Sequence, residues 1–183
     1  MVAELISVGT EILLGNITNT NASYLAEQCA ALGLSCYYQV TVGDNSKRLK
    51  DALITALSRA DIVILTGGLG PTDDDLTKET AAAVFHARLV QDEHTRQRIE
   101  NYLKKGNYTI TENNWKQALV PEGCKIVDND NGTAPGLIMT NDEGQKLILL
   151  PGPPGELYPM FEHQIRPKES LIISLGRGMV IIA

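Results

Sequence analysis

The chain has 183 residues, of which 43% are hydrophobic and 21% charged, and its formal net charge is −6. This length favours one domain with a packed core, and the acidic balance argues against a broad basic surface for nucleic acid. A phosphate-bearing small ligand is still compatible with it, because a local group of backbone N–H donors can bind phosphate on an acidic protein.

The cysteines Cys29, Cys36 and Cys124 form no Cys-x-x-Cys pair, and their number and spacing fit neither a disulfide framework nor a zinc site. We therefore expect free thiols in a reducing compartment. The N-terminus lacks a basic segment followed by a long apolar one, so no signal peptide is predicted. No apolar run reaches membrane-spanning length. Together these features predict a cytoplasmic protein without a membrane partner.

The first part of the chain alternates strand and helix patterns. A helix is expected from residue 19 or 20 up to Gly33, which suits a left-handed C-terminal cap. A second helix is expected to follow Ser46 as its N-cap. Strands are expected at residues 3–8, 34–42 and 61–66, and the last is almost wholly apolar, as in a strand covered on both faces. This order predicts right-handed crossovers and a parallel sheet.

The second part begins with a third helix after a Gly-rich turn. The polar residues 91–105 predict a helix with few core anchors, at the periphery or at an oligomer contact, and we expect a homo-oligomer, either a dimer or a trimer. The apolar tail, residues 167–183, is expected to be an edge strand or the opening of a further domain. Shorter elements are expected at 112–119 (helix), at 124–127, 136–140 and 146–150 (strands), and from the Pro-rich turn to about residue 164 (helix).

Three segments end a predicted strand with a sharp turn, and they are Gly9–Glu11, Gly67–Gly70 and Pro151–Gly155. In open parallel sheets, ligands bind beyond the carboxyl ends of the strands. Glycines let the main chain approach a ligand, and their N–H groups can form a phosphate nest. Any one loop is equally well explained as an ordinary turn, but the three together favour a ligand site. The Gly67–Gly70 turn has neither the lysine of a Walker A motif nor the spacing of a dinucleotide fingerprint.

An acidic run, Asp73-Asp74-Asp75, follows the Gly-rich turn at the predicted start of a helix. Carboxylates there complement the helix dipole, and Thr72 with Asp75 resembles a capping box. Yet this much negative charge beside a phosphate nest would repel an anionic ligand. A divalent cation, Mg²⁺ or Mn²⁺, removes the conflict, since Mg²⁺ is typically held by one or two carboxylates plus substrate oxygens. Asp73 or Asp75 is the expected metal contact, and the spacing does not choose between them.

Other polar residues have two readings. Asp44 follows the second strand and Glu11 follows a strand-ending glycine, so each fits a turn or cap as well as a site role. Asn21 is assigned to the first turn of a helix, and Thr133 lies in another loop of small residues. The histidines have no partners at metal-ligand spacing, and nothing resembles a Ser-His-Asp or Cys-His nucleophile system.

Several of these motifs, in this order, resemble the N-terminal domain of the CinA (competence/damage-inducible) family, which is similar to the molybdopterin-binding MoaB/MogA domains. The resemblance implies a three-layer α/β/α domain, doubly wound around a mostly parallel sheet and covering residues 1–166. It rests on Gly9–Gly15, Thr20-Asn21, Val42–Asn45, Thr66–Thr77, Gly132–Gly136 and Leu150–Pro154.

The resemblance also implies a chemistry. In CinA-type domains this is divalent-metal-dependent hydrolysis of ADP-ribose to AMP and ribose 5-phosphate. In the molybdopterin-handling relatives, two aspartates that bear on activity correspond to Asp44 and Asp75. Leu69 stands where those relatives usually carry threonine, which is a departure from pterin-transfer chemistry. Full-length CinA proteins continue into a nicotinamide-nucleotide amidase domain beyond the matched residues, so the resemblance does not assign that activity to this chain.

The combined expectation is a nucleotide pyrophosphatase with Asp44, Asp75 and Glu11 in catalytic positions and a metal at Asp73 or Asp75. A noncatalytic module that binds molybdopterin or a nucleotide is the alternative, and a domain kept mainly for oligomerisation is a third reading. Ligand contacts are expected at Gly67, Gly68, Leu69, Gly70, Thr72, Thr133, Gly152 and Pro153.

Overall fold

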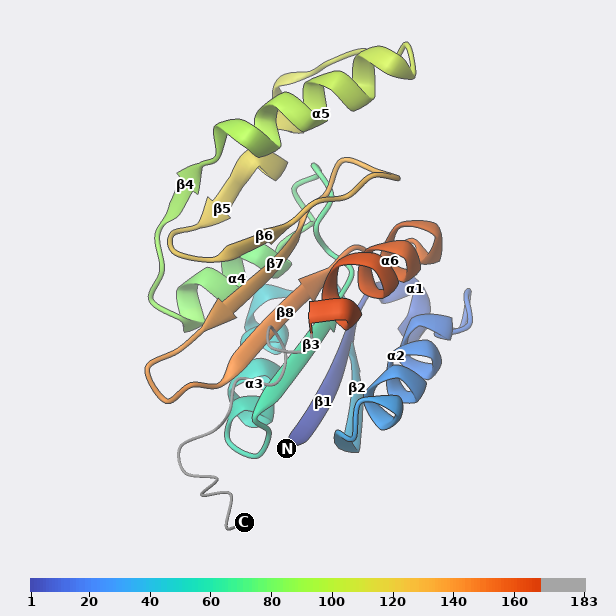
Figure 1. Ribbon diagram of the computed structural model, residues 1–183, viewed down its shortest axis with the longest axis vertical. Coiled ribbons are helices and arrows are strands. Elements are labelled where there is room, and N and C mark those ends of the chain that lie inside the picture. The colour runs from blue at the N-terminus through green and yellow to red at the C-terminus, as the bar shows by residue number, and fades with distance from the viewer. Residues whose placement is uncertain (169–183) are drawn as a thin grey trace.

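The computed structural model describes residues 1–168, which form a mixed sheet with helices on both faces and a smaller lobe at one end (Figure 1). The six-stranded sheet has the order β2-β1-β3-β8-β7-β6. Four strands pair in parallel: β1 (Val2–Val8), β2 (Ser35–Val42), β3 (Ile62–Thr66) and β8 (Lys146–Leu150). The strands β7 (Gly136–Thr140) and β6 (Lys125–Val127) continue the sheet with antiparallel pairing. The predicted doubly wound, mostly parallel sheet is confirmed.

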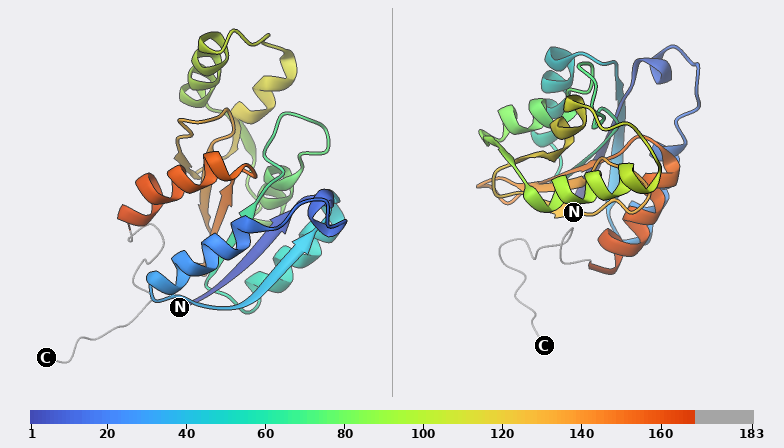
Figure 2. Two further views of the ribbon diagram at one scale, coloured as in Figure 1. Left: turned by 90° about the vertical axis from the view of Figure 1, so that its right-hand side faces the viewer. Right: turned by 90° about the horizontal axis from the view of Figure 1, so that it is seen from above.

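Two helical layers cover the sheet because its buried strands are apolar on both faces. Side chains alternate between the faces along a strand. On one face Leu5 and Ile64 pack with α2 (Thr20–Ala31) and α6 (Pro154–Met160). On the other, Ile6 and Leu65 pack with α3 (Ser46–Leu57) and α4 (Thr77–Val84), and Figure 2 shows the layers edge-on. Burying one such side chain contributes about 1.5–3 kcal/mol.

The lobe, which we call the α5 lobe, lies at the top of Figure 1. Its core is small: Ile99, Leu103 and Ala118 pack with Tyr102, Ile110 and Trp115. The predicted peripheral helix over 91–105 with few anchors is therefore confirmed. The lobe comprises β4 (Leu89–Gln91), α5 (Glu93–Lys105), the 3₁₀ helix η1 (Glu112–Ala118) and β5 (Leu119–Pro121), and β4 pairs antiparallel with β5.

Helix starts depart from the sequence expectations. Asn45, not Ser46, caps α3, because its side chain accepts a hydrogen bond from the Arg48 N–H at 3.0 Å. The helix α4 begins at Thr77 without a side-chain cap, so the prediction that Thr72 and Asp75 cap it was wrong. The predicted loop after β1 contains a one-turn helix, α1 (Thr10–Leu13).

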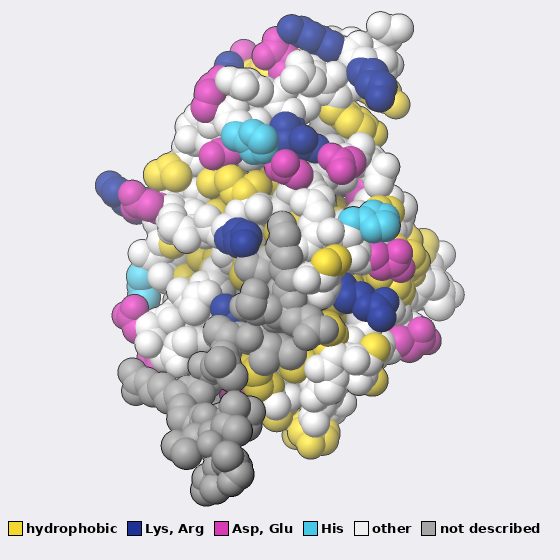
Figure 3. All heavy atoms as spheres, viewed as in Figure 1, with side chains coloured by type: hydrophobic (Ala, Val, Ile, Leu, Met, Phe, Trp, Pro, Cys, Tyr) yellow, Lys and Arg dark blue, Asp and Glu magenta, His cyan; other side chains and the backbone are white. Residues whose placement is uncertain are grey.

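The last described residues extend α6 by a π-helical turn, Phe161–Ile165, and a 3₁₀ turn, Arg166–Lys168. The interpretation of the tail concerns residues beyond Lys168, which lie outside the described residues. No helix within residues 1–168 is long and apolar enough to cross a membrane. On the face shown in Figure 3, Lys and Arg side chains lie scattered among acidic ones.

Candidate active site

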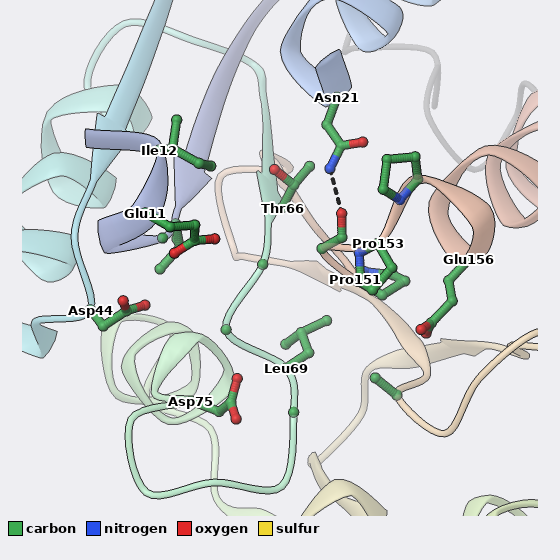
Figure 4. Close-up of a pocket in the computed structure, with 18 of the residues that line it drawn as sticks. Glu11, Ile12, Asn21, Asp44, Thr66, Leu69, Asp75, Pro151, Pro153 and Glu156 are labelled. Carbon is green, nitrogen blue, oxygen red and sulfur yellow. Dashed lines mark hydrogen bonds between the residues drawn. The ribbon is translucent and has the colours of Figure 1, made fainter. Parts of the chain in front are cut away.

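A cleft of about 780 Å³ opens beyond the carboxyl ends of the parallel strands. The chain turns from β1 to the neighbouring strand β2 and returns to β3 on the other side of β1, so the cleft lies at a topological switch point, where ligands bind in such sheets. The three loops expected to form a site, which follow β1, β3 and β8, all line it. Figure 4 shows them converging.

Gly67 and Gly68 let the loop after β3 pass tightly against its neighbours. Their φ values are +93° and +66°, in the left-handed region that favours glycine. A Cβ on Gly67 would lie 2.2 Å from the carbonyl oxygen of Val8, and one on Gly68 would lie 2.2 Å from Oγ1 of Thr77. That hydroxyl also donates to the Gly67 carbonyl at 2.8 Å. The start of the loop is therefore fixed by its main chain.

Fewer backbone N–H groups are available to a ligand than the sequence predicted. The N–H of Gly67 donates to the carbonyl of Leu150 at 3.0 Å and is not available to a ligand. The N–H groups of Gly68, Leu69 and Gly70 make no hydrogen bond to other described residues. Proline has no N–H, so Pro153 can offer a ligand only its surface. In the Gly67–Gly70 turn and the loop after β8, the unengaged N–H groups that line the cleft are therefore those of residues 68–70 and of Gly152.

Carboxylates dominate the lining of the cleft. Among the described residues that line it there is no Lys, Arg or His. Asp73 is exposed and is not brought to the cleft, whereas Asp74 lines it. No three His, Cys, Asp or Glu side chains of residues 1–168 are grouped so that they alone could hold a metal ion. The lining carboxylates are Glu11, Asp44, Asp74, Asp75 and Glu156.

Three of these carboxylates lie directly against glycine α-carbons. An added Cβ would approach a carboxylate oxygen to 2.6 Å or less at each position, closer than real contacts. The loop glycines thus make room for acidic side chains as well as for a ligand. The pairs are Gly9 with Glu11, Gly70 with Asp75 and Gly132 with Glu156.

Asp75 closes a four-residue turn rather than capping a helix. Its Oδ2 accepts hydrogen bonds from the Thr72 N–H at 2.9 Å and from the Thr72 hydroxyl at 2.5 Å. Lys116 of the α5 lobe donates to the carbonyls of Thr72 and Asp75, at 2.5 and 2.7 Å. Lys78 in turn donates to the Lys116 carbonyl at 2.5 Å, and burial lowers the pKa of Lys78 to about 8. Lys116 therefore holds the acidic turn, residues 72–75, from the side of the α5 lobe, and Lys78 in turn holds Lys116.

Asp44 links two loops of the cleft. Its Oδ2 accepts from the Thr10 N–H at 3.0 Å, and its own N–H donates to the Thr10 hydroxyl at 3.1 Å. These two bonds fasten α1 to the loop after β2. Figure 4 shows Glu11, which follows Thr10, on the same side of the cleft as Asp44.

Sequence reasoning missed two side-chain amides that tether the loops. Asn21, assigned only to a helical turn, donates to the Gly152 carbonyl at 2.6 Å (Figure 4). Gln117 of the α5 lobe donates to the Leu69 carbonyl at 3.0 Å and is only 3% exposed. The one sequence signal was that Asn21 belongs to a motif of the CinA resemblance. Nothing local marked Gln117.

Glu156 was also missed as a site residue. It lies in the first turn of α6 and lines the cleft. Its Oε2 accepts a hydrogen bond from Asn129 Nδ2 at 2.6 Å. Burial raises the pKa of the Glu156 carboxyl, and the hydrogen bond from Asn129 opposes this effect.

Comparison with known proteins identifies the family of this chain. The family model described as "Probable molybdopterin binding domain" matches residues 4–169. A solved structure described as the protein CinA with unknown function, from Thermoplasma acidophilum, is 35% identical with a TM-score of 0.82, over 94% of this chain and 98% of that chain. The chain therefore belongs to the molybdopterin-binding-domain family, in its CinA branch.

Two longer relatives are named "Putative competence-damage inducible protein". The one from Clostridium beijerinckii is 51% identical over all of this chain and 47% of its own length. The one from Caldicellulosiruptor bescii is 54% identical over 91% of this chain and 40% of its length. The chain thus spans less than half of these relatives. The tungsten cofactor synthesizing protein MoaB of Pyrococcus furiosus, at 18% identity and a TM-score of 0.63 over 97% of both chains, shows the shared fold.

Proposed function

We propose that this domain is a divalent-metal-dependent nucleotide pyrophosphatase that hydrolyses ADP-ribose to AMP and ribose 5-phosphate. The observation that carries the proposal is the composition of the cleft. Unengaged N–H groups at residues 68–70 suit phosphate oxygens. Five carboxylates line the same cleft, without a described basic side chain among them. A diphosphate can enter such a cleft only if a cation offsets the repulsion.

The carboxylates fit a hard divalent cation, which prefers oxygen ligands. Asp75 and Asp44 each bind the protein through Oδ2, and the Oδ1 of each accepts no hydrogen bond from described residues. Because no three such side chains are grouped to hold an ion alone, water and diphosphate oxygens would complete the coordination. The metal would supply charge neutralisation on the phosphoryl oxygens.

The remaining residues bind and orient. The N–H groups of residues 68–70 hold the diphosphate, while Glu11 and Asp44 orient the ribose. Thr133 and Gly152 also line the cleft and are further candidates for ligand contacts. Asn21 and Gln117 keep the two loops at a fixed separation through their bonds to Gly152 and Leu69.

A noncatalytic module that binds a pterin or nucleotide is the second candidate. The description of the matching family, which speaks of molybdopterin binding, favours it. Leu69 in the middle of the Gly-rich loop is 8% exposed and provides an apolar surface on which a planar ring could rest. Calorimetry that detects tight binding of molybdopterin or a nucleotide without turnover would support this candidate over the first.

The test is turnover of ADP-ribose with and without Mn²⁺, with AMP measured by chromatography. We expect AMP only when the metal is present. Asp75→Asn should lower kcat at least about 100-fold, because the amide is a poor ligand for a hard cation. Asp73→Asn is the matched control, since Asp73 is exposed and outside the cleft. A folded wild-type protein that releases no AMP under either condition would refute the proposal.

A further inference from the structure

We propose that Glu156 is the general base of this cleft and takes the proton of the water that attacks the diphosphate. This assignment rests on the proposed function, and no sequence motif pointed to it. It follows from where the side chain lies, from what holds it, and from the charges around it.

Glu156 enters the cleft from a different wall than the other carboxylates. It comes from the first turn of α6, which begins at Pro154 after the loop that follows β8. In Figure 4 its carboxylate reaches toward the space beside Leu69, while Glu11, Asp44 and Asp75 lie on the other side of Leu69. A ligand between the two walls would thus meet the cation on one side and Glu156 on the other.

A neutral, fully engaged amide fixes this carboxylate. Asn129 is 7% exposed, and its Nδ2 donates to Glu156 Oε2 at 2.6 Å and to the Ala134 carbonyl at 2.9 Å. Its Oδ1 accepts from the Asn131 N–H at 3.0 Å, which determines the orientation of the amide. Gly132 packs against the same carboxylate. Oε1 of Glu156 accepts no hydrogen bond from described residues, so one oxygen is held and the other is free to accept a proton.

The basic side chains near Glu156 pair with other carboxylates and not with Glu156. Asp128 and Asp130, on the loop that also carries Asn129, are engaged by α5: His94 Nε2 lies 3.0 Å from Asp128, and Arg98 lies 3.5 Å from Asp128 and 2.5 Å from Asp130. The other charged groups that line the cleft are the carboxylates of Glu11, Asp44, Asp74 and Asp75.

This environment suits proton transfer. Burial raises the pKa of the Glu156 carboxyl, and no ion pair among described residues counteracts that effect. A carboxyl with a raised pKa is a stronger base than an ordinary one, and general bases are commonly tuned in this way. Asp75, in contrast, accepts two hydrogen bonds on one oxygen, which leaves its other oxygen for a cation.

The chemical step balances without a further reactant. The water oxygen forms a bond to one phosphorus as its proton passes to Oε1 of Glu156. The bond from that phosphorus to the bridging oxygen breaks, and its electron pair remains on the departing phosphate. Glu156 then releases the proton to solvent, and two phosphate monoesters leave the cleft.

The experiment compares Glu156→Gln with Glu162→Gln. Glu162 follows α6 in its π-helical extension, accepts a hydrogen bond from the Tyr24 hydroxyl at 3.3 Å and does not line the cleft. With ADP-ribose and Mn²⁺, Glu156→Gln should lower kcat about 100- to 10,000-fold. KM should change less than about threefold, and the acidic limb of the pH profile of kcat should disappear. Glu162→Gln should keep the wild-type kcat and the acidic limb.

Each outcome is decisive. If Glu156→Gln keeps kcat within about threefold and retains the acidic limb while the wild type turns over ADP-ribose, the base assignment fails and the pyrophosphatase stands. If the wild type releases no AMP, both fail together. If the Gln variant does not fold by circular dichroism, Glu156→Asp replaces it. That variant should retain an acidic limb at reduced kcat, and its absence would overturn the assignment.

Discussion

The main sheet and the α5 lobe both hold the Gly-rich loop, but by different means. The sheet and α4 hold the beginning of the loop at its main-chain atoms: the Gly67 N–H donates to the Leu150 carbonyl, and the Gly67 carbonyl accepts from the Thr77 hydroxyl. The lobe fixes the later part through side chains, because Gln117 bonds to the Leu69 carbonyl and Lys116 to two carbonyls of the acidic turn. The lobe is peripheral to the core, yet it is part of the site.

This difference shows which part of the Gly-rich loop a side-chain substitution can affect. The beginning of the loop is held by a main-chain bond to Leu150 and by one side chain, the Thr77 hydroxyl, so its position depends mainly on the fold. The part held by Lys116 and Gln117 depends on two side chains of η1. A substitution in the lobe can therefore loosen the acidic turn while the sheet stays intact.

The largest effect is expected from Gly67→Ala, compared with Gly144→Ala. Both glycines have positive φ, +93° and +85°, but only Gly67 has an atom, the Val8 carbonyl oxygen, within 2.2 Å of an added Cβ. Gly144→Ala should lower the free energy of unfolding by about 1 kcal/mol, and Gly67→Ala by about 4 kcal/mol, because overlap adds to the backbone strain. Urea unfolding measures both. Equal losses would show that the sheet does not confine the loop.

A smaller effect on stability is expected from Lys78, which is buried and donates to the Lys116 carbonyl. Burial lowers its pKa to about 8 from 10.5, so between these pH values the unfolded chain binds more protons than the folded one. Stability must then rise with pH across this window. Relative to Lys78→Met, the free energy of unfolding of the wild type should increase by at most about 3 kcal/mol from pH 8 to 10.5. Parallel stability profiles of the two proteins would contradict the burial of a charged ammonium.

The smallest effect is expected from Lys116→Met. It removes two hydrogen bonds to the acidic turn and should lower the free energy of unfolding by about 1–2 kcal/mol. Amide exchange at Thr72 and Asp75, whose N–H groups bond within the turn, should become about tenfold faster. Lys104→Met is the control, because Lys104 pairs with Glu100 on the surface of α5. If exchange is unchanged in Lys116→Met, the lobe does not clamp the turn.

The sequence predicts the sheet and the position of the cleft well, because both depend on local patterns. The apolar run of β3 and the turns after β1, β3 and β8 place the three loops at one edge. Asp44, Asp75 and Glu11 all line the cleft as expected. The strands β4 and β5 were not predicted, since three residues each carry too short a pattern.

The missed site residues act through partners that are distant in sequence. Asn21 bonds to a carbonyl 131 residues away, Gln117 to one 48 residues away, and Glu156 to an amide 27 residues away. Patterns within a helix or turn cannot reveal such pairs. The spacing could not choose between Asp73 and Asp75 for a related reason: which carboxylates of the run line the cleft depends on the turn that Asp75 closes with Thr72.

The glycines that lie against carboxylates differ from Gly67 in one respect that matters for evolution. At Gly9, Gly70 and Gly132 an added methyl group would meet the end of an acidic side chain rather than backbone. Such a substitution would push the carboxylate aside and leave the fold standing. Under the proposed function, single changes at these positions would therefore abolish catalysis while the protein still folds. If the proposed function holds, an enzyme lineage with this fold can in that way give rise to descendants that only bind.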